Sequence, residues 1–195
     1  MDKIILASSS PRRQKILRQV GIPFEILPSG ITEDIGAEMS PYEAVRTLSE
    51  EKAMYAVDKV NGPALILAAD TIVDLNGKIM GKPADEADAF GILKKLQGRK
   101  HSVYTGVCII KKTADELIMR SIIDNAAVFM RPMTDEEIHA YIKTGEPMDK
   151  AGAYAIQERG SIFVERIEGD FYTVEGLPIV RVYQELKNLG VVMGI

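Results

Sequence analysis

The sequence has little of the side-chain chemistry on which several common enzyme classes depend. Its 195 residues include one cysteine, two histidines and no tryptophan. One thiol excludes an intrachain disulfide and a cysteine-based zinc site, and Cys108 lies in the apolar run VCII, which is typical of a small core residue. His101 and His139 are far apart and neither adjoins a serine and aspartate constellation. A Ser-His-Asp triad therefore has little support, and structural or surface roles are expected for both histidines.

Long apolar runs and an excess of positive charge are also missing. The chain shows no basic-then-apolar leader and no apolar stretch of about 18 residues, so we expect a cytoplasmic protein with no membrane partner. The formal net charge of −4 and the pI near 5.3 argue against an extended nucleic-acid surface. The motif GxxxxGK[ST] is absent, which argues against a P-loop kinase or ATPase.

What the sequence does contain is a mixed succession of helix and strand signals. The predicted helices cover residues 11–20, 41–60, 85–97, 134–145 and 178–189. The predicted strands cover residues 3–7, 24–27, 63–75, 78–83, 101–112 and 117–130, with a further hairpin over 161–174. Long antiparallel strands with interspersed helices favour an α/β or α+β sheet over a regular βαβ alternation.

The stretch IILASSSPRRQKIL places two arginines in the first turn of a predicted helix. Ser10 is a suitable N-cap and Pro11 suits the first helical position, so Arg12 and Arg13 lie where the helix dipole is already positive. A phosphate bound by the turn's N–H groups and by both guanidinium groups would resolve this conflict. The alternative is two solvated arginines paired with nearby carboxylates.

Asp70 is a carboxylate within the apolar strand LILAADTIV. Because a lone buried carboxylate costs several kcal/mol, Asp70 is expected to have a partner or to border a cleft. If Asn76-Gly77 is a two-residue turn, the returning strand brings Lys82 opposite Thr71 and close to Asp70. This juxtaposition of acid and base favours catalysis over a salt bridge that only fixes the hairpin register.

Two further polar residues stand out less clearly. Lys52 follows Val45 and Leu48 on the inward stripe of the long predicted helix, where snorkelling of the lysine to solvent is the usual explanation. Glu33 lies in an acidic loop, and such loops are usually solvated surface. Taken with Asp70 and the arginines, this mixture of cations and carboxylates suits phosphoryl chemistry.

The segments LASSSPRR, AADTIV, GKP, MDKAGAYAIQ and GDFYTVEGLPI occur in this order over essentially the whole chain. Together they resemble the Maf family of nucleoside triphosphate pyrophosphatases. The resemblance implies hydrolysis of a nucleoside triphosphate to the monophosphate and pyrophosphate with a divalent metal cation, Mg, Mn or Co. It also implies that residues 1–195 form a single domain and that the protein is a homodimer. The implied fold is α/β, with a mixed twisted sheet flanked by helices around a central cleft, as in inosine triphosphatase-like proteins.

The resemblance also assigns residues. Asp70 matches the catalytic carboxylate described as the proton acceptor, and with Glu33 it matches the metal position. The substrate-binding positions of the family match Ser8, Arg12, Arg13, Lys52, Thr71, Lys82 and Gln157. Of these, Arg12, Thr71 and Gln157 match the positions tied to specificity.

The segment AGAYAIQ with GLPI is similar to the branch of the family that acts on dTTP and UTP in nucleotide pool cleaning. Gln157 offers both a donor and an acceptor to a pyrimidine edge. Glu158 stands where the family pattern usually has glycine, which leaves the breadth of the substrate pocket open. Two alternatives remain: a 7-methyl-GTP pyrophosphatase, and a non-catalytic nucleotide-binding regulator of cell division.

Overall fold

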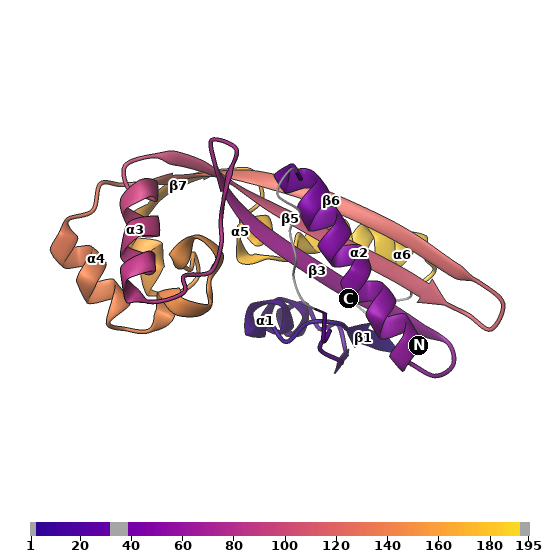
Figure 1. The fold of residues 1–195 in the computed structure, drawn as a ribbon. Coiled ribbons are helices and arrows are strands. Elements are labelled where there is room, and N and C mark those ends of the chain that lie inside the picture. Colours follow the sequence, from indigo (N-terminus) through magenta and orange to yellow (C-terminus); the bar gives the residue numbers. More distant parts are fainter. Residues whose placement is uncertain (1–2, 32–38, 192–195) are drawn as a thin grey trace. The chain divides into compact units, whose positions relative to one another are not determined.

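A computed structural model describes residues 3–31 and 39–191 (Figure 1). Glu33, which the resemblance assigns to the metal, lies outside the described residues. The α-helices are α1 (Pro11–Gln19), α2 (Pro41–Lys59), α3 (Glu86–Leu96), α4 (Asp135–Ile142), α5 (Phe171–Glu175) and α6 (Ile179–Asn188). The strands are β1 (Ile4–Leu6), β2 (Glu25–Ile26), β3 (Ala64–Leu75), β4 (Lys78–Met80), β5 (Lys100–Lys112), β6 (Leu117–Met130) and β7 (Val164–Glu168). Three 3-10 helices are η1 (Glu146–Asp149), η2 (Ala151–Ala153) and η3 (Arg159–Phe163).

The strands form one mixed sheet in the order β2-β1-β3-β5-β6-β7, with β4 paired to β3. Strand β1 is parallel to both β2 and β3, whereas the β3–β4 and β6–β7 pairs are antiparallel. The predicted α/β class with a mixed sheet is therefore confirmed. No helix in the described part of the chain is both long and apolar enough to cross a bilayer.

By its internal contacts the chain divides into two compact units, each assembled from segments that are distant in sequence. The first unit comprises Met1–Asp70, Thr105–Asp124 and Gly176–Ile195, and the second comprises Thr71–Tyr104 and Asn125–Glu175. Each of the long strands β3, β5 and β6 contributes residues to both units. The prediction of one domain over residues 1–195 stays a prediction.

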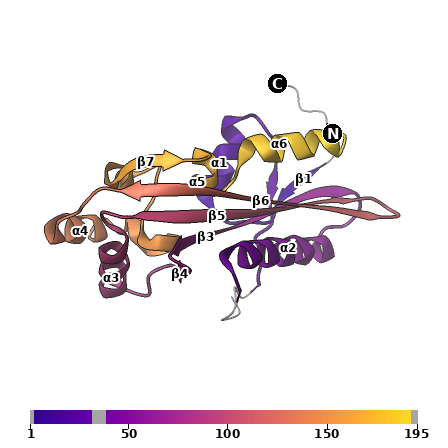
Figure 2. The same cartoon turned by 90° about the horizontal axis from the view of Figure 1, so that it is seen from above.

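In the first unit, helices cover both faces of the strands. Figure 2 shows α2 on one face of β3 and β5, and α1 and α6 on the other. The core beneath α2 is built from small and β-branched side chains, among them Ala53, Ala68 and Cys108. Helix α2 approaches β5 so closely that a Cβ on Gly106 would lie 2.3 Å from the Val45 carbonyl oxygen, so no side chain fits there. Cys108 is fully buried, as predicted, and burial raises the pKa of its thiol to about 12.

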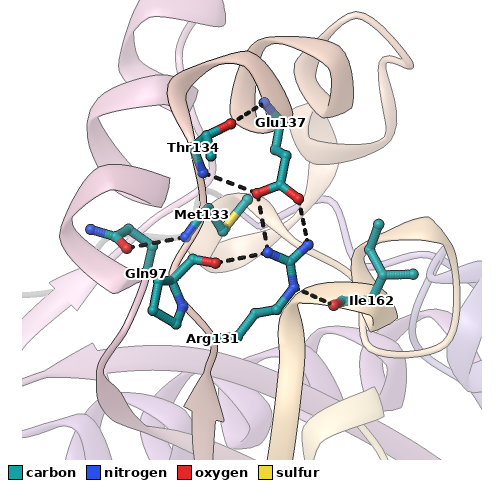
Figure 3. A network of polar contacts seen from close by, with 7 residues as sticks. Gln97, Arg131, Met133, Thr134, Glu137 and Ile162 are labelled. Carbon is teal, nitrogen blue, oxygen red and sulfur yellow. Dashed lines mark hydrogen bonds and ion pairs between the residues drawn. The ribbon is translucent and has the colours of Figure 1, made fainter.

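In the second unit, a separate apolar core joins β3 and β5 to α3, α4 and η2. The start of α4 is fixed by a polar network around Glu137 (Figure 3). Glu137 accepts hydrogen bonds from both Arg131 Nη atoms, at 3.1 and 2.8 Å, and from the Thr134 backbone N–H at 3.0 Å. The Thr134 Oγ1 in turn accepts from the Glu137 N–H, which completes the predicted capping box. The Arg131 hydrogen bonds lower the pKa of Glu137 to about 2.

Several local predictions are confirmed. The Ser40–Glu43 capping box opens α2, and Asn76 and Gly77 both have positive φ, as a type I′ turn requires. Leu75 pairs with Lys78 in the predicted register, although β4 ends at Met80 instead of continuing to 83.

The predicted hairpin over 161–174 is wrong. Residues 159–163 form η3, β7 pairs with β6 instead of with a following strand, and residues 171–175 form helix α5. The Asp170 side chain accepts a hydrogen bond from the Tyr172 N–H at 3.0 Å and so starts a helical turn where the sequence had indicated a returning strand.

Candidate functional site

The predicted strand–turn–helix junction between β1 and α1 is present, and Arg13 points inward within it. Arg13 Nη1 donates to Ser8 Oγ at 3.1 Å, and Arg13 Nε donates to the Gly176 carbonyl oxygen at 2.8 Å. Ser8 and Arg13 are both buried. Ser10 occupies the N-cap position without a side-chain capping bond, and Ser8 Oγ instead accepts from the Ser10 N–H at 3.2 Å. Arg13 therefore ties the turn after β1 to the segment before α6.

Arg12 differs from its neighbour. It is half-buried, and within residues 3–31 and 39–191 its guanidinium makes no hydrogen bond or ion pair. The first turn of α1 contains no acidic residue that would offset this charge. Among the described residues, acceptors bind Arg13 but not Arg12, so the charge conflict noted in the sequence is resolved differently for the two arginines.

Asp70 and Lys52 form a buried ion pair in the first unit. Lys52 Nζ lies 2.5 Å from Asp70 Oδ1, and the two side chains are 7% and 10% exposed. Lys52 therefore does not reach solvent, so the snorkelling alternative is wrong, and its placement on the inward stripe of α2 is confirmed. Breaking such a pair leaves an uncompensated buried charge, which typically costs about 3 to 5 kcal/mol.

The expected partner of Asp70 is present, and it lies outside the predicted hairpin. Asp70 pairs with Lys52 from α2, whereas Lys82 is exposed and lies beyond the end of β4. The antiparallel ladder of β3 and β4 ends at Val73 and Met80, so it does not extend to Thr71 and Lys82. Thr71 is half-buried and follows Asp70 in β3, where successive side chains point to opposite faces.

Gln157 carries two buried polar atoms that are not satisfied by protein groups. Its Oε1 and Nε2 are shielded from solvent, and neither has a hydrogen-bond partner in the described part of the chain. Buried polar groups are nearly always paired, so an unpaired amide indicates a place for a ligand or for water. Glu158, by contrast, is exposed.

Around Gln157 the structure shows residues that the sequence had not singled out. Tyr141 Oη donates to Glu146 Oε1 at 2.8 Å and accepts from the Ala155 N–H at 3.2 Å. Glu146 Oε2 accepts from the Arg159 N–H at 3.0 Å, and its Oε1 accepts from the Gly160 N–H at 2.9 Å. The partners of Glu146 lie 13 and 14 residues along the chain, at the start of η3, so no helical or strand spacing indicates them.

Both histidines have the structural or surface roles expected of them. His101 is buried, and its Nε2 lies 2.8 Å from Tyr154 Oη. Burial lowers the pKa of His101 to about 4. His139 is exposed and stacks on Phe90, with 4.7 Å between the ring centroids.

In the described part of the chain no three His, Cys, Asp or Glu residues are grouped as a metal cage would require. Asp70 is the one assigned ligand that the structure describes, and its Oδ1 already accepts from Lys52. This donor set fits the mode in which Mg²⁺ is held by one or two carboxylates together with substrate phosphates, and it does not fit an all-protein site.

The mixed seven-stranded sheet and its helices define an α/β protein. The chain belongs to the Maf family, because the family model described as Maf-like protein matches residues 3–189. It is 49% identical over 193 residues to a dTTP/UTP pyrophosphatase of Caldicellulosiruptor bescii, covering 97% of this chain and 96% of that protein. It is 48% identical over 191 residues to a dTTP/UTP pyrophosphatase of Bacillus cereus, covering 98% and 97% of the two chains.

A solved structure has the same fold at low sequence identity. A HAM1 protein from Coxiella burnetii aligns with a TM-score of 0.50 and 15% identity, over 96% of this chain and all of that one. The likeness supports the fold class expected from the sequence.

Proposed function

We propose that this protein hydrolyses dTTP and UTP to the nucleoside monophosphate and pyrophosphate. The observation that carries the proposal is the near-complete alignment, at 49% identity, with a relative named dTTP/UTP pyrophosphatase. The buried pair of Asp70 and Lys52 and the arginine-bearing turn supply the acid, base and cationic groups that this chemistry needs.

In the proposed reaction, water attacks the α-phosphorus in line and pyrophosphate leaves. Asp70 accepts the proton of the attacking water, and Lys52 orients the carboxylate through their 2.5 Å contact. Arg12, Arg13 and Lys82 neutralise the phosphate oxygens, and Ser8 fixes the Arg13 guanidinium. Thr71 and Gln157 contribute to nucleotide selection, with the Gln157 amide facing the base edge.

A divalent cation, Mg, Mn or Co, is proposed to bind with the triphosphate. Asp70 and Glu33 would hold it, and it would supply charge neutralisation on the phosphates. Hard oxygen ligands of this kind suit such ions. EDTA should abolish turnover, and readdition of Mg²⁺ or Mn²⁺ should restore it.

Further assignments rest on the family alone. We propose a single Maf domain over residues 1–195, with a central nucleotide-binding cleft, a homodimer, and a cytoplasmic location. No nucleic-acid or membrane partner is proposed. Size-exclusion chromatography with light scattering tests the homodimer.

The deciding experiment is pyrophosphate release from dTTP, UTP, CTP, GTP and 7-methyl-GTP, with Mg²⁺ or Mn²⁺ and with EDTA. Metal-dependent turnover that prefers dTTP and UTP supports the proposal. Preference for 7-methyl-GTP would assign the chain to the methylated-purine alternative. Binding of these nucleotides without turnover would favour the non-catalytic regulator.

A further inference from the structure

The segment that carries Gln157 is held at both ends by two side chains outside it. We use the name Gln157 segment for residues 155–160. At its start the Ala155 N–H donates to Tyr141 Oη, and at its end the Arg159 and Gly160 N–H groups donate to the two Glu146 oxygens. The Gln157 amide between these ends has no hydrogen-bond partner among residues 3–31 and 39–191.

Tyr141 and Glu146 are themselves joined, so the two ends of the segment share one support. Tyr141 is buried and donates to Glu146 Oε1 at 2.8 Å. Burial and this hydrogen bond raise the pKa of Tyr141, which keeps its phenol protonated and able to donate. The Glu146 carboxylate is acceptor-only when ionised, so its two oxygens match the backbone N–H groups and the phenol without competition.

Close packing leaves the segment little room for a second arrangement. A Cβ on Gly160 would lie 2.5 Å from Tyr141 Oη and 2.7 Å from the Ala155 carbonyl oxygen. The chain leading into the segment has positive φ at Gly152 and at Ala153, the latter rare for a residue with a side chain. Rigid support around an unpaired amide is what recognition of a ligand requires, because a ligand bond to a mobile amide would first have to order it.

We propose that Glu146 and Tyr141 are positioning residues for base selection. They hold the Gln157 segment in one conformation, so that the Gln157 side-chain amide contacts the nucleobase from a fixed position. The inference rests on the proposed function, in which Gln157 faces the base. The support is distinct from the Glu137 network, in which a carboxylate pairs with an arginine and caps a helix.

The test changes the hydrogen-bonding atoms of Glu146 and of Tyr141 in separate variants. Glu146→Gln keeps the shape but turns one accepting oxygen into a donor, so one of the two backbone N–H bonds is lost. We expect the KM for UTP to rise about tenfold with kcat within about twofold, since the base contact lies away from the reacting phosphorus. We further expect the ratio of kcat/KM for UTP to that for GTP to fall by a similar factor. This ratio does not depend on the fraction of folded enzyme.

Tyr141→Phe provides the second variant, because it removes the acceptor for the Ala155 N–H while keeping the ring. Glu137→Gln is the matched control: it weakens a carboxylate network of the same unit and should leave the UTP to GTP ratio unchanged. If Glu146→Gln and Tyr141→Phe lower melting temperature yet keep the wild-type ratio, the positioning role is overturned. If wild-type enzyme releases no pyrophosphate from dTTP or UTP, it is the proposed function that fails.

Discussion

The regions around Asp70 and around Gln157 differ in how their buried polar groups are hydrogen-bonded. In the first unit the buried candidate groups are bound by protein groups: Lys52 pairs with Asp70, and Arg13 is bound by Ser8 and Gly176. In the second unit the support is separate from the candidate ligand contact. The Gln157 amide has no hydrogen-bond partner in the part of the chain that the structure describes, whereas the backbone of its neighbours is hydrogen-bonded to Glu146. Stability and function should therefore be coupled around Asp70 and separable around Gln157.

The largest effect is expected at Asp70. Asp70→Asn removes the proton acceptor, and kcat should fall by roughly 1,000-fold. It also breaks the buried ion pair with Lys52, so the free energy of unfolding should drop by up to about 3 to 5 kcal/mol. Pyrophosphate release and urea unfolding measure the two losses on the same protein.

A double variant separates these two losses. Lys52→Met combined with Asp70→Asn removes the buried charge, so much of the lost stability should return while turnover stays low. Recovery of turnover along with stability would reduce Asp70 to a structural partner of Lys52.

The two arginines provide the next comparison. Arg12→Ala should lower kcat/KM for UTP by about 10-fold to 100-fold with little change in melting temperature, because Arg12 makes no bond within the described residues. Arg13→Ala should lower both, since it also breaks the bonds to Ser8 and Gly176. A large loss of stability in Arg12→Ala, with turnover unchanged, would contradict a phosphate-binding role.

A smaller effect on turnover is expected at Gln157. Gln157→Ala should raise the KM for UTP about tenfold. Because the amide is buried and no described residue pairs with it, its removal should leave the melting temperature unchanged or raise it. Isothermal titration with a non-hydrolysable UTP analogue and a thermal melt measure both quantities, and a marked fall in stability would show that the amide already has a structural partner.

Local signals predicted much of the fold because they act within one turn or one hairpin. The capping boxes at Ser40 and Thr134 and the Asn76-Gly77 turn each satisfy backbone groups a few residues away, so the sequence specifies them directly. The hairpin predicted over residues 161–174 was wrong because the alternating apolar residues there resemble a pair of strands. The cap that makes residues 171–175 helical is a single side chain, Asp170.

The candidate site was predictable in composition but not in pairing. An apolar strand interrupted by Asp70 and an inward-facing Lys52 both signalled unusual residues, yet their 2.5 Å contact joins residues 18 positions apart on different elements. Sequence spacing placed Lys82 opposite Thr71 and near Asp70, and it had no means to identify Lys52 of α2 as the residue that pairs with Asp70. The Glu146 support lacked any signal, because its bonds go to backbone N–H groups that every residue except proline carries.

The smallest effect on catalysis is expected from His101, which should instead set a pH dependence of stability. Its pKa of about 4 in the folded state lies below the ordinary 6.5, so the unfolded chain binds the proton first as pH falls. His101 therefore contributes stability above pH 6.5 that is lost as the pH falls toward 4, by up to about 3 kcal/mol.

The variant His101→Gln keeps a polar partner for Tyr154 Oη and does not titrate in this pH range. Urea unfolding of both proteins from about pH 7 to about pH 4 should show wild type losing its stability faster. Parallel curves would mean that His101 is already hydrated in the folded protein. Its Nδ1, which has no hydrogen-bond partner among the described residues, would then be satisfied by water.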